Sequence, residues 1–425
     1  MSSATVFDSV LFRNIFGTEE IRECFSEKSY VAHMIEAECA LSKAEEAEGV
    51  IPGGVADVIC QHSDVSKIDW KLLGSRTEIV GYPVFPLVEQ MASWCPENEA
   101  GYIHWGATTQ DVMDIASVLQ MREGLAIVEH LIKRIVQTLQ AMAKKYRDTP
   151  MAGRTHLQHA LPITFGYKCG SSSGGAAGTL ASLGDNGVRV RKRLASLLGL
   201  RDPVITWHVA RDTVAEIVNF LALVGGTLGK IALDLMIMCS NELNEVSEPY
   251  VPHRGASSTM PQKRNPISSE VILAQSKILR AQSGLLLDAM ITDFERASGP
   301  WHLEWTAVPT AFISAVGSLH QADFALAGLQ VNEGAMLANL QGTRGLIVAE
   351  AVMMALAHHT GRQEAHEVVY QACVKACEDG ESLLETLQEI EIVVKYIDHE
   401  ELEQLCDPTR YMGTCQLMVD ELLAQ

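Results

Sequence analysis

Apolar side chains recur three and four residues apart along most of the chain, which is the spacing of one face of an α-helix. The first clear run covers residues 30–48 and ends at the turn-forming residues 49–54. Further runs follow at residues 107–146, 214–246, 269–291 and 305–329. Alternating strand patterns are scarce, so the pattern predicts an all-α fold.

Helices of this length with wide apolar faces have to pack on one another, because such faces are unfavourable in water. A chain of 425 residues is also too long for one compact core. We therefore predict three helical domains, with a central bundle of long helices over 101–330 between an N-terminal domain (1–100) and a C-terminal one (331–425). A single chain would leave much of the bundle exposed, so we expect the bundle to oligomerise.

The charge balance is strongly acidic, with 33 lysine and arginine residues against 53 aspartate and glutamate residues and a net charge of −20. Such a chain repels phosphates, so we expect no nucleic-acid partner and no membrane partner. The first residues lack the pattern of a secretory signal. The most apolar stretch, residues 216–230, is shorter than the roughly 20 residues that cross a bilayer and predicts a buried helix.

The ten cysteines include no CxxC pair. Cys373 and Cys377 lie one helical turn apart, but no further cysteine or histidine nearby completes a zinc-like spacing. We therefore expect no metal site and interpret the cysteines as reduced thiols of a cytoplasmic protein.

Glycine- and proline-rich breaks between the predicted helices hold the chemically informative side chains, at residues 101–111, 151–166, 170–178 and 251–266. The last break carries Ser257, Ser258 and Lys263 and leads into Asn265-Pro266, a typical helix start. Its small, polar and basic composition is typical of a flexible lid in front of a rigid helix.

A lysine and an asparagine beside a helix N-terminus favour the binding of a carboxylate. Removing a proton next to a carboxylate builds further negative charge on it, which fixed donors stabilise. An activated serine in the same loop can act as the base. On residue types alone, a solvated Ser/Gly loop with a capping role explains this segment as well as a catalytic lid does.

The segment His253-Arg-Gly-Ala-Ser-Ser-Thr-Met-Pro-Gln-Lys-Arg-Asn-Pro-Ile-Ser-Ser-Glu270 resembles the signature of the fumarase/aspartase superfamily. Two further segments stand in the order of that superfamily, His104-Trp-Gly-Ala-Thr-Thr-Gln-Asp111 and Gly153-Arg-Thr-His-Leu-Gln-His-Ala-Leu-Pro-Ile-Thr-Phe-Gly166. The resemblance extends from about Phe16 to the C-terminus.

Within the superfamily the chain is most similar to the 3-carboxy-cis,cis-muconate lactonizing enzymes, or cycloisomerases. This similarity rests on Trp207-His208, Arg211-Asp212, Glu295-Arg-Ala-Ser-Gly-Pro-Trp-His-Leu-Glu-Trp305, Thr343-Arg-Gly-Leu-Ile-Val-Ala-Glu350 and Asp407-Pro-Thr-Arg-Tyr-Met-Gly413. Fungal trans-aconitate decarboxylase belongs to the same branch and is similar at Thr77-Glu-Ile-Val-Gly-Tyr-Pro-Val84. The adenylosuccinate lyases are more distant relatives.

The resemblance implies roles for the side chains of the lid. Ser257 aligns with the catalytic base of the superfamily, and Ser258 is its neighbour. Lys263 and Asn265 align with the ligands of the substrate carboxylate. The chemistry that these residues imply needs no cofactor.

The other two segments supply further implied site residues. Thr108 and Thr109 fall where the superfamily binds a carboxylate. His156 matches the general acid of the adenylosuccinate-type lyases, and Glu270 matches a carboxylate that supports that histidine. Gln158, in the same segment as His156, is expected to bind substrate. Many lactonizing enzymes lack the histidine, so its presence leaves lyase chemistry open.

Three further residues have alternative interpretations. Arg211 and Arg296 fit substrate contacts, and they fit interhelical or surface ion pairs equally well. His159 is a second candidate beside His156, and either histidine also fits a hydrogen-bonding role in a polar core.

One segment departs from the superfamily. After Pro162-Ile-Thr-Phe-Gly-Tyr-Lys168 the family continues a long bundle helix, whereas here Cys-Gly-Ser-Ser-Ser leads at once to Gly174-Gly-Ala-Ala-Gly178. Each absent residue removes about 1.5 Å of helix, so the bundle is expected to be shortened after Lys168. This departure bears on assembly and on activity.

The resemblance implies a homotetramer whose active sites are shared between subunits and which acts on an unsaturated di- or tricarboxylic acid through a carboxylate-stabilised carbanion. Cycloisomerisation is the first expectation, and trans-aconitate decarboxylation or a C–N or C–O elimination is the second. An inactive relative kept as a structural protein is the alternative from another class. The shortening after Lys168 favours that alternative, and the intact lid disfavours it.

Overall fold

The computed structural model describes residues 4–155, 158–165, 187–202, 210–252, 254–255, 260, 262–292 and 299–424. The chain forms two compact units. Unit 1 comprises Met1–Leu131, Ser173–Lys230 and Val271–Gln321, and unit 2 comprises Ile132–Ser172, Ile231–Glu270 and Ala322–Gln425.

Helices dominate the described residues, which confirms the predicted all-α class. The five helices predicted from periodicity are present as α3 (Glu27–Ala47), α8 (Thr109–Lys145), α10 (Asp212–Met238), α11 (Ile267–Ala289) and α12 (Pro300–Ala327). The predicted end of α10 at residue 246 is wrong. The helix stops at Met238, and Val246 instead lies in strand β3 (Val246–Ser247), which pairs antiparallel with β4 (Gln330–Val331).

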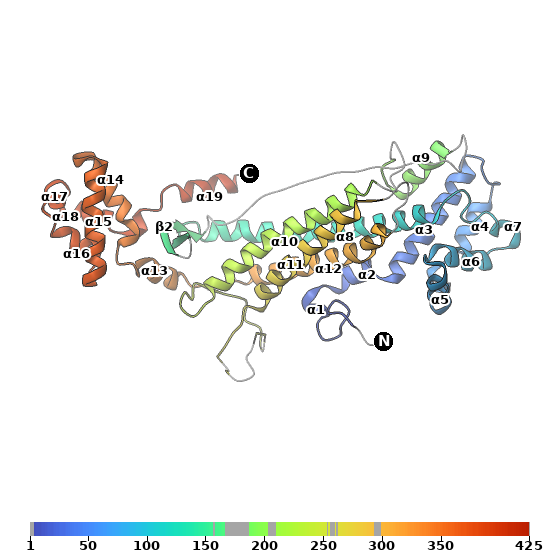
Figure 1. The fold of residues 1–425 in the computed structure, drawn as a ribbon, viewed down its shortest axis with the longest axis horizontal. Coiled ribbons are helices and arrows are strands. Elements are labelled where there is room, and N and C mark those ends of the chain that lie inside the picture. Colours follow the sequence, from blue (N-terminus) through green and yellow to red (C-terminus); the bar gives the residue numbers. More distant parts are fainter. Residues whose placement is uncertain are drawn as a thin grey trace. The chain divides into compact units, whose positions relative to one another are not determined.

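Between α3 and α8 the chain folds into short helices that pack with α3 around one apolar core (Figure 1). Val31, Met34, Ile59, Leu87 and Met91 belong to this core, and Trp301 of α12 closes it. The shorter elements are α1 (Arg13–Phe16), α2 (Glu19–Cys24), α4 (Val55–His62), η1 (Val65–Lys67), α5 (Trp70–Val80), α6 (Val84–Trp94) and α7 (Glu97–Ala100).

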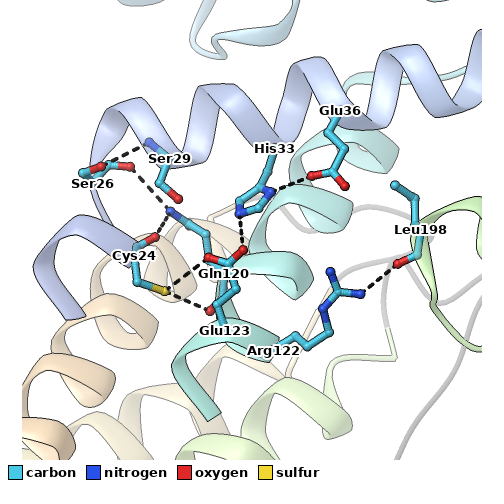
Figure 2. Close-up of polar contacts among 9 residues, drawn as sticks. All are labelled: Cys24, Ser26, Ser29, His33, Glu36, Gln120, Arg122, Glu123 and Leu198. Atoms are coloured by element: carbon cyan, nitrogen blue, oxygen red, sulfur yellow. Dashed lines mark hydrogen bonds and ion pairs between the residues drawn. The ribbon is translucent and has the colours of Figure 1, made fainter. Parts of the chain in front are cut away.

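Polar contacts fasten α2 and α3 to α8 (Figure 2). The Cys24 thiol donates to the Gln120 carbonyl at 3.3 Å, and the Gln120 amide donates to the Cys24 carbonyl at 2.8 Å. His33 lies between the carboxylates of Glu36, at 2.9 Å, and Glu123, at 3.3 Å. These contacts fix the orientation of α8 behind the loop that carries the first motif.

Glycines allow close approach between the long helices of unit 1. A Cβ atom at Gly225 of α10 would lie 2.5 Å from Leu279 Cδ1 of α11, and one at Gly229 would lie 2.9 Å from Ser276 Oγ. A Cβ at Gly124 of α8 would lie 2.7 Å from the ring of Phe312 of α12. The long helices therefore run side by side at short range, as Figure 1 shows.

Helix α10 is longer than the apolar stretch that predicts it. With 27 residues it is long and apolar enough, by length and composition alone, to cross a membrane, so the predicted shortness of this segment is wrong. The close glycine contacts with α11 are those of a helix packed inside a protein bundle.

Unit 2 holds the break at residues 151–166 as a β-hairpin, which the sequence did not predict. Strand β1 (Pro150–Thr155) pairs antiparallel with β2 (Gln158–Thr164), and the register shifts between Ala152 and Arg154. Gly153 fits this bulge because a Cβ there would lie 2.5 Å from the Leu161 carbonyl oxygen.

The C-terminal helices pack around a second apolar core that includes Leu356, Val369, Leu387 and Leu402 (Figure 1). The predicted division into three domains stays a prediction. The remaining elements are α9 (Gly187–Leu198), α13 (Glu333–Gln341), η4 (Leu346–Val348), α14 (Ala349–Thr360), α15 (Arg362–Asp379), α16 (Leu383–Gln388), α17 (Glu391–Tyr396), α18 (His399–Leu405), η5 (Pro408–Arg410) and α19 (Cys415–Leu423).

Candidate active site

Thr108 and Thr109 are half-buried at the N-terminus of α8, where the positive end of the helix dipole favours an anion. The Thr108 amide donates to the Asp111 carboxylate at 2.9 Å, and the Asp111 amide donates to the Thr108 carbonyl at 3.0 Å. This reciprocal pair fixes the first turn of α8 and therefore the position of both threonines.

His104, at the start of the same motif, is held by a buried carboxylate. Its Nδ1 lies 2.6 Å from Glu38 Oε1, and its backbone adopts a left-handed φ of 62°. Burial opposes the imidazolium charge, but the hydrogen bond and charge of Glu38 outweigh burial and raise the pKa of His104. Sequence reasoning missed this pair, although a glutamate on the apolar face of the predicted helix 30–48 was a usable signal.

Glu45 lies two turns beyond Glu38 on the same face of α3 and is fully buried. Among the described residues, neither of its carboxylate oxygens has a hydrogen-bond partner. Burial, aided by the charge of Glu38, raises the pKa of Glu45 to about 8. The Glu45 carboxyl group is therefore mostly neutral at pH 7.

The second motif lies on the β-hairpin of unit 2. Gln158 is exposed and pairs with Thr155 across the turn, while His156 lies outside the described residues. His159 is half-buried, and burial, together with the charge of Arg154, lowers its pKa. A histidine with a lowered pKa is neutral at pH 7, and the buried Nδ1 of His159 has no hydrogen-bond partner among the described residues.

A buried carboxylate fastens this hairpin to the segment that leads to the lid. Arg154 of β1 donates two hydrogen bonds to Glu245, at 2.9 and 2.7 Å. Asn339 of α13 donates to the same carboxylate at 3.0 Å and to the Leu243 carbonyl at 2.8 Å. Sequence patterns do not indicate this network, because its members lie far apart along the chain.

The base of the lid is closed by Gly255 and Asn265. The Gly255 carbonyl accepts from the Asn265 backbone amide at 3.0 Å and from its side-chain amide at 3.1 Å. Lys263 is exposed, and its backbone amide donates to the Met260 carbonyl at 3.1 Å. Ser257 and Ser258 lie outside the described residues.

Helix α11 begins directly behind the lid, and its first amides already have a partner. Glu248 accepts from the Ser268 amide at 3.1 Å and from the Ser269 amide and hydroxyl at 2.8 Å each. Glu270 is exposed in the same first turn, and its backbone amide donates to the Pro266 carbonyl at 3.0 Å. An internal carboxylate therefore occupies the anion position of this helix.

Arg211 belongs to a buried cluster in unit 1. It donates to Asp114 at 2.8 and 3.0 Å and to Glu304 at 2.7 Å through Nε and again through Nη2. Burial opposes its charge, but Glu304 and Asp114 outweigh burial and raise its pKa. Arg296, the other arginine with two interpretations, lies outside the described residues.

The same cluster lines a cavity of about 180 Å³ inside unit 1. Tyr30 and the two tryptophans Trp301 and Trp305 form aromatic parts of its wall, and Arg211 and Glu304 form polar parts. Because Arg211 already binds two carboxylates here, its described contacts favour the ion-pair interpretation over a substrate contact.

The described candidate residues fall in both units. Thr108, Thr109 and Arg211 belong to unit 1, and Gln158, Lys263, Asn265 and Glu270 belong to unit 2. Within unit 2, the hairpin and the base of the lid are attached to the one short segment that contains Glu245 and Glu248.

The chain matches two protein-family models. The model described as "Lyase" matches residues 16–173 and 170–279, and the model described as "Adenylosuccinate lyase C-terminus" matches residues 345–422. The two lyase matches meet at residues 170–173, where the sequence departs from the family after Lys168. The break in the match therefore coincides with the predicted shortening.

Curated relatives are similar over nearly the whole chain. Trans-aconitate decarboxylase 1 of Mycosarcoma maydis is 42% identical over 97% of this chain and 88% of its own length. The 3-carboxy-cis,cis-muconate cycloisomerase of Acinetobacter baylyi is 37% identical over 98% of both. Both alignments are longer than this chain, at 434 and 444 positions against 425 residues, so this chain lacks residues that these relatives have.

Solved structures share the fold along the whole length. A fumarate lyase from Mesorhizobium sp. BNC1 has a TM-score of 0.88 at 48% identity, covering 96% of this chain and 98% of its own. The 3-carboxy-cis,cis-muconate lactonizing enzyme of Pseudomonas putida has a TM-score of 0.90 at 33% identity, covering 97% and 98%. Matched in sequence, fold and motif order, the chain belongs to the fumarase/aspartase superfamily of lyases and cycloisomerases.

Proposed function

We propose that this enzyme acts on an unsaturated di- or tricarboxylic acid, exchanging a proton on the carbon next to a carboxylate and stabilising the carbanion formed there. The observation that carries this proposal is the intact lid sequence on a closed base, with Lys263 exposed between the Gly255–Asn265 closure and the Met260 turn. An exposed ammonium group beside a fixed loop base supplies the charge that a dianionic intermediate needs.

In this mechanism Ser257 takes the proton, with Ser258 beside it. Lys263 and Asn265 hold the carboxylate on which charge develops. After its bond to Gly255, the side-chain amide of Asn265 has a second N–H that can donate to the carboxylate. Electrostatic stabilisation of this kind is the largest contribution in many enzymes that build an oxyanion.

The remaining residues bind the substrate and transfer the second proton. Thr108 and Thr109 hold a second carboxylate at the positive end of α8. His156 delivers or receives the second proton, with Glu270 in support, and Gln158 and Arg296 contact the substrate. Arg211, whose described contacts are with Asp114 and Glu304, contacts the substrate only if it leaves this ion-pair cluster. No step in this scheme uses a cofactor.

Cycloisomerisation of 3-carboxy-cis,cis-muconate is the first candidate reaction, because several curated cycloisomerases match nearly the whole chain at 34–37% identity. Decarboxylation of trans-aconitate is the second candidate, favoured by the 42% identity to the Mycosarcoma maydis enzyme. Both reactions pass through a carbanion beside a carboxylate. Cycloisomerisation forms it when a carboxylate oxygen adds to a C=C bond and ends by protonating it, and decarboxylation forms it by loss of CO2. We further propose a cytoplasmic homotetramer with shared active sites.

A substrate screen tests the proposal. The purified enzyme is offered 3-carboxymuconate, the aconitates, fumarate and adenylosuccinate, and the ultraviolet absorbance of the conjugated acid is followed. We expect turnover of one tricarboxylic or dicarboxylic acid. Turnover of none of them by a folded enzyme would contradict the proposal and favour an inactive relative.

Ser257→Ala tests the assignment of the base. We expect turnover to fall by about 10²–10⁴-fold, the usual contribution of a positioned base, with unchanged circular dichroism. Ser75→Ala, at an exposed serine of α5, is the matched control and should keep full activity. Full activity in Ser257→Ala would exclude this serine as the base.

A further inference from the structure

We propose that Glu248 is a positioning residue for the lid, which it holds by occupying the N-terminus of α11. This inference rests on the proposed function, because the lid has a catalytic role only in that reaction. Glu248 itself lies outside the set of residues expected to touch substrate. It acts through Ser268 and Ser269, the first buried residues of the helix behind the lid.

The contacts of Glu248 are those of a charged helix cap. Its two carboxylate oxygens accept from the backbone amides of Ser268 and Ser269, and Oε1 also accepts from the Ser269 hydroxyl. Both serines have no exposed surface, so without Glu248 these amides would lie buried away from water. Unpaired amides at a helix start are costly, and a carboxylate there also complements the helix dipole.

Further contacts connect this cap to the lid. Arg254, at the start of the lid, donates to the Ser268 hydroxyl at 2.7 Å and lies 4.3 Å from the ring centre of Phe324. At the other end, Ile267 donates its amide to the Asn265 carbonyl at 2.9 Å. Both ends of the lid are therefore attached to the turn that Glu248 holds.

Gly255 makes this attachment rigid. Its φ of +72° is left-handed, and a Cβ there would lie 2.5 Å from the Asn265 carbonyl oxygen. The lid can close on Asn265 only because residue 255 has no side chain. The closure and the cap together define where Lys263 is presented.

The cap also separates the substrate from the helix. With the Ser268 and Ser269 amides bound to Glu248, a substrate carboxylate has to find its donors in the lid, on Lys263 and Asn265. If Glu248 is truncated, two amides face a space shaped for a carboxylate, so a small carboxylate from solution can replace it. Acetate is the matched probe.

The experiment compares Glu248→Ala with Glu242→Ala, which removes an exposed glutamate from the same connecting segment. Amide hydrogen exchange is measured at Asn265, Ser268 and Ser269, and turnover is measured in sodium acetate and in sodium chloride of equal ionic strength. In Glu248→Ala we expect amide exchange to become roughly tenfold or more faster and turnover roughly tenfold or more slower. Both changes follow from losing charged hydrogen bonds. Acetate should restore much of both, and Glu242→Ala should match the unmodified enzyme in both salts.

Equal exchange and equal turnover in Glu248→Ala and Glu242→Ala would overturn the proposal. So would a loss in Glu248→Ala that acetate and chloride leave equally large, because that outcome indicates general damage. If Glu248→Ala does not fold, exchange and turnover are measured in Glu248→Gln, which keeps the side-chain volume and loses the charge. Values equal to those of Glu242→Ala would then overturn the proposal. If the unmodified enzyme turns over no polycarboxylate, the proposed function fails, while the exchange and acetate measurements still test the cap.

Discussion

The buried glutamates of this protein differ in the side chain that donates hydrogen bonds to each carboxylate. Glu245 and Glu304 each accept two hydrogen bonds from an arginine, and Glu38 meets the imidazole of His104. Glu45 has no described hydrogen-bond partner and a pKa raised to about 8. A buried carboxyl group without a nearby cation is more stable in its neutral form, so Glu45 is protonated in the folded protein at pH 7.

Glu45 predicts a specific dependence of stability on pH. Its folded pKa of about 8 lies above the ordinary value of 4.5, so folding favours the protonated form. Its contribution is fully present below about pH 4.5 and is lost as the pH rises to about 8. Glu45→Gln keeps the neutral shape at every pH. We expect it to raise the free energy of unfolding at pH 8 by about 2 kcal/mol, allowing for solvent screening, and to change little at pH 4.5.

Urea unfolding at both pH values measures this difference. Glu46→Gln is the contrasting control, because hydrogen bonds from the backbone of residues 54 and 56 lower the pKa of Glu46. That contribution is present above pH 4.5 and lost on acidification, so Glu46→Gln should be destabilised at pH 8. A Glu45→Gln variant with the same pH dependence as the unmodified protein would show that Glu45 ionises normally.

The motifs identified the expected site residues in the sequence, but they did not reveal which residues hold them. Thr108, Lys263 and Asn265 stand at the loop and helix ends that sequence patterns predict. Glu38, which binds His104 of the first motif, and Glu248, which caps the helix behind the lid, lie in other segments. Nothing in periodicity pairs a side chain with a donor that is distant in the chain, so these contacts needed the structure.

At the scale of elements, sequence periodicity located the long helices and failed at their ends. Helix α10 stops at Met238 because Glu245 turns inward to Arg154 and Asn339, and β3 begins at Val246. Apolar residues continue through that region, so a helical pattern alone extends the helix too far. The β-hairpin was missed for a similar reason, since its strands carry prolines and glycine and pair locally.

The glycines of α10 predict opposite effects at neighbouring positions. In Gly229→Ala the new methyl group meets Ser276 at 2.9 Å and 3.0 Å, and Ser276 is too short to move aside. We expect a loss of about 1–3 kcal/mol in the free energy of unfolding. In Gly226→Ala no atom lies within 4 Å, and the better helix former should add about 0.5–1 kcal/mol.

Thermal or denaturant unfolding of the two variants side by side gives the comparison. Both variants carry the same substitution in the same helix, about one turn apart. The main difference between them is therefore the packing around the new methyl group. Equal stability of the two variants would contradict the close approach of α10 and α11.

At the scale of the whole molecule, the proposed tetramer with shared active sites predicts complementation. Ser257→Ala and His156→Ala should each be inactive as pure proteins. When the two are unfolded together and refolded, mixed tetramers contain some sites with both residues intact. We expect about a quarter or less of normal turnover to return, since random mixing leaves few complete sites.

Light scattering on the same samples reports the assembly. A tetramer that regains no activity on mixing would place Ser257 and His156 of each site in one subunit. A monomer would contradict the shared active site, and the shortening after Lys168 would then be its expected cause. The match to the lyase model divides into two pieces at this point, which is why assembly is measured together with activity.

The closure of the lid on one carbonyl group has a consequence for changes in the length of the lid. Gly255 and Asn265 lie ten positions apart in sequence and are joined at their backbones. For such a loop, doubling its length costs only about 0.6 kcal/mol in chain entropy. A change in the length of the lid would therefore cost little stability, and its cost would fall instead on where Ser257 and Lys263 stand. Stability and activity would then limit this loop differently: chain entropy tolerates a change in its length, whereas the proposed roles of Ser257 and Lys263 do not.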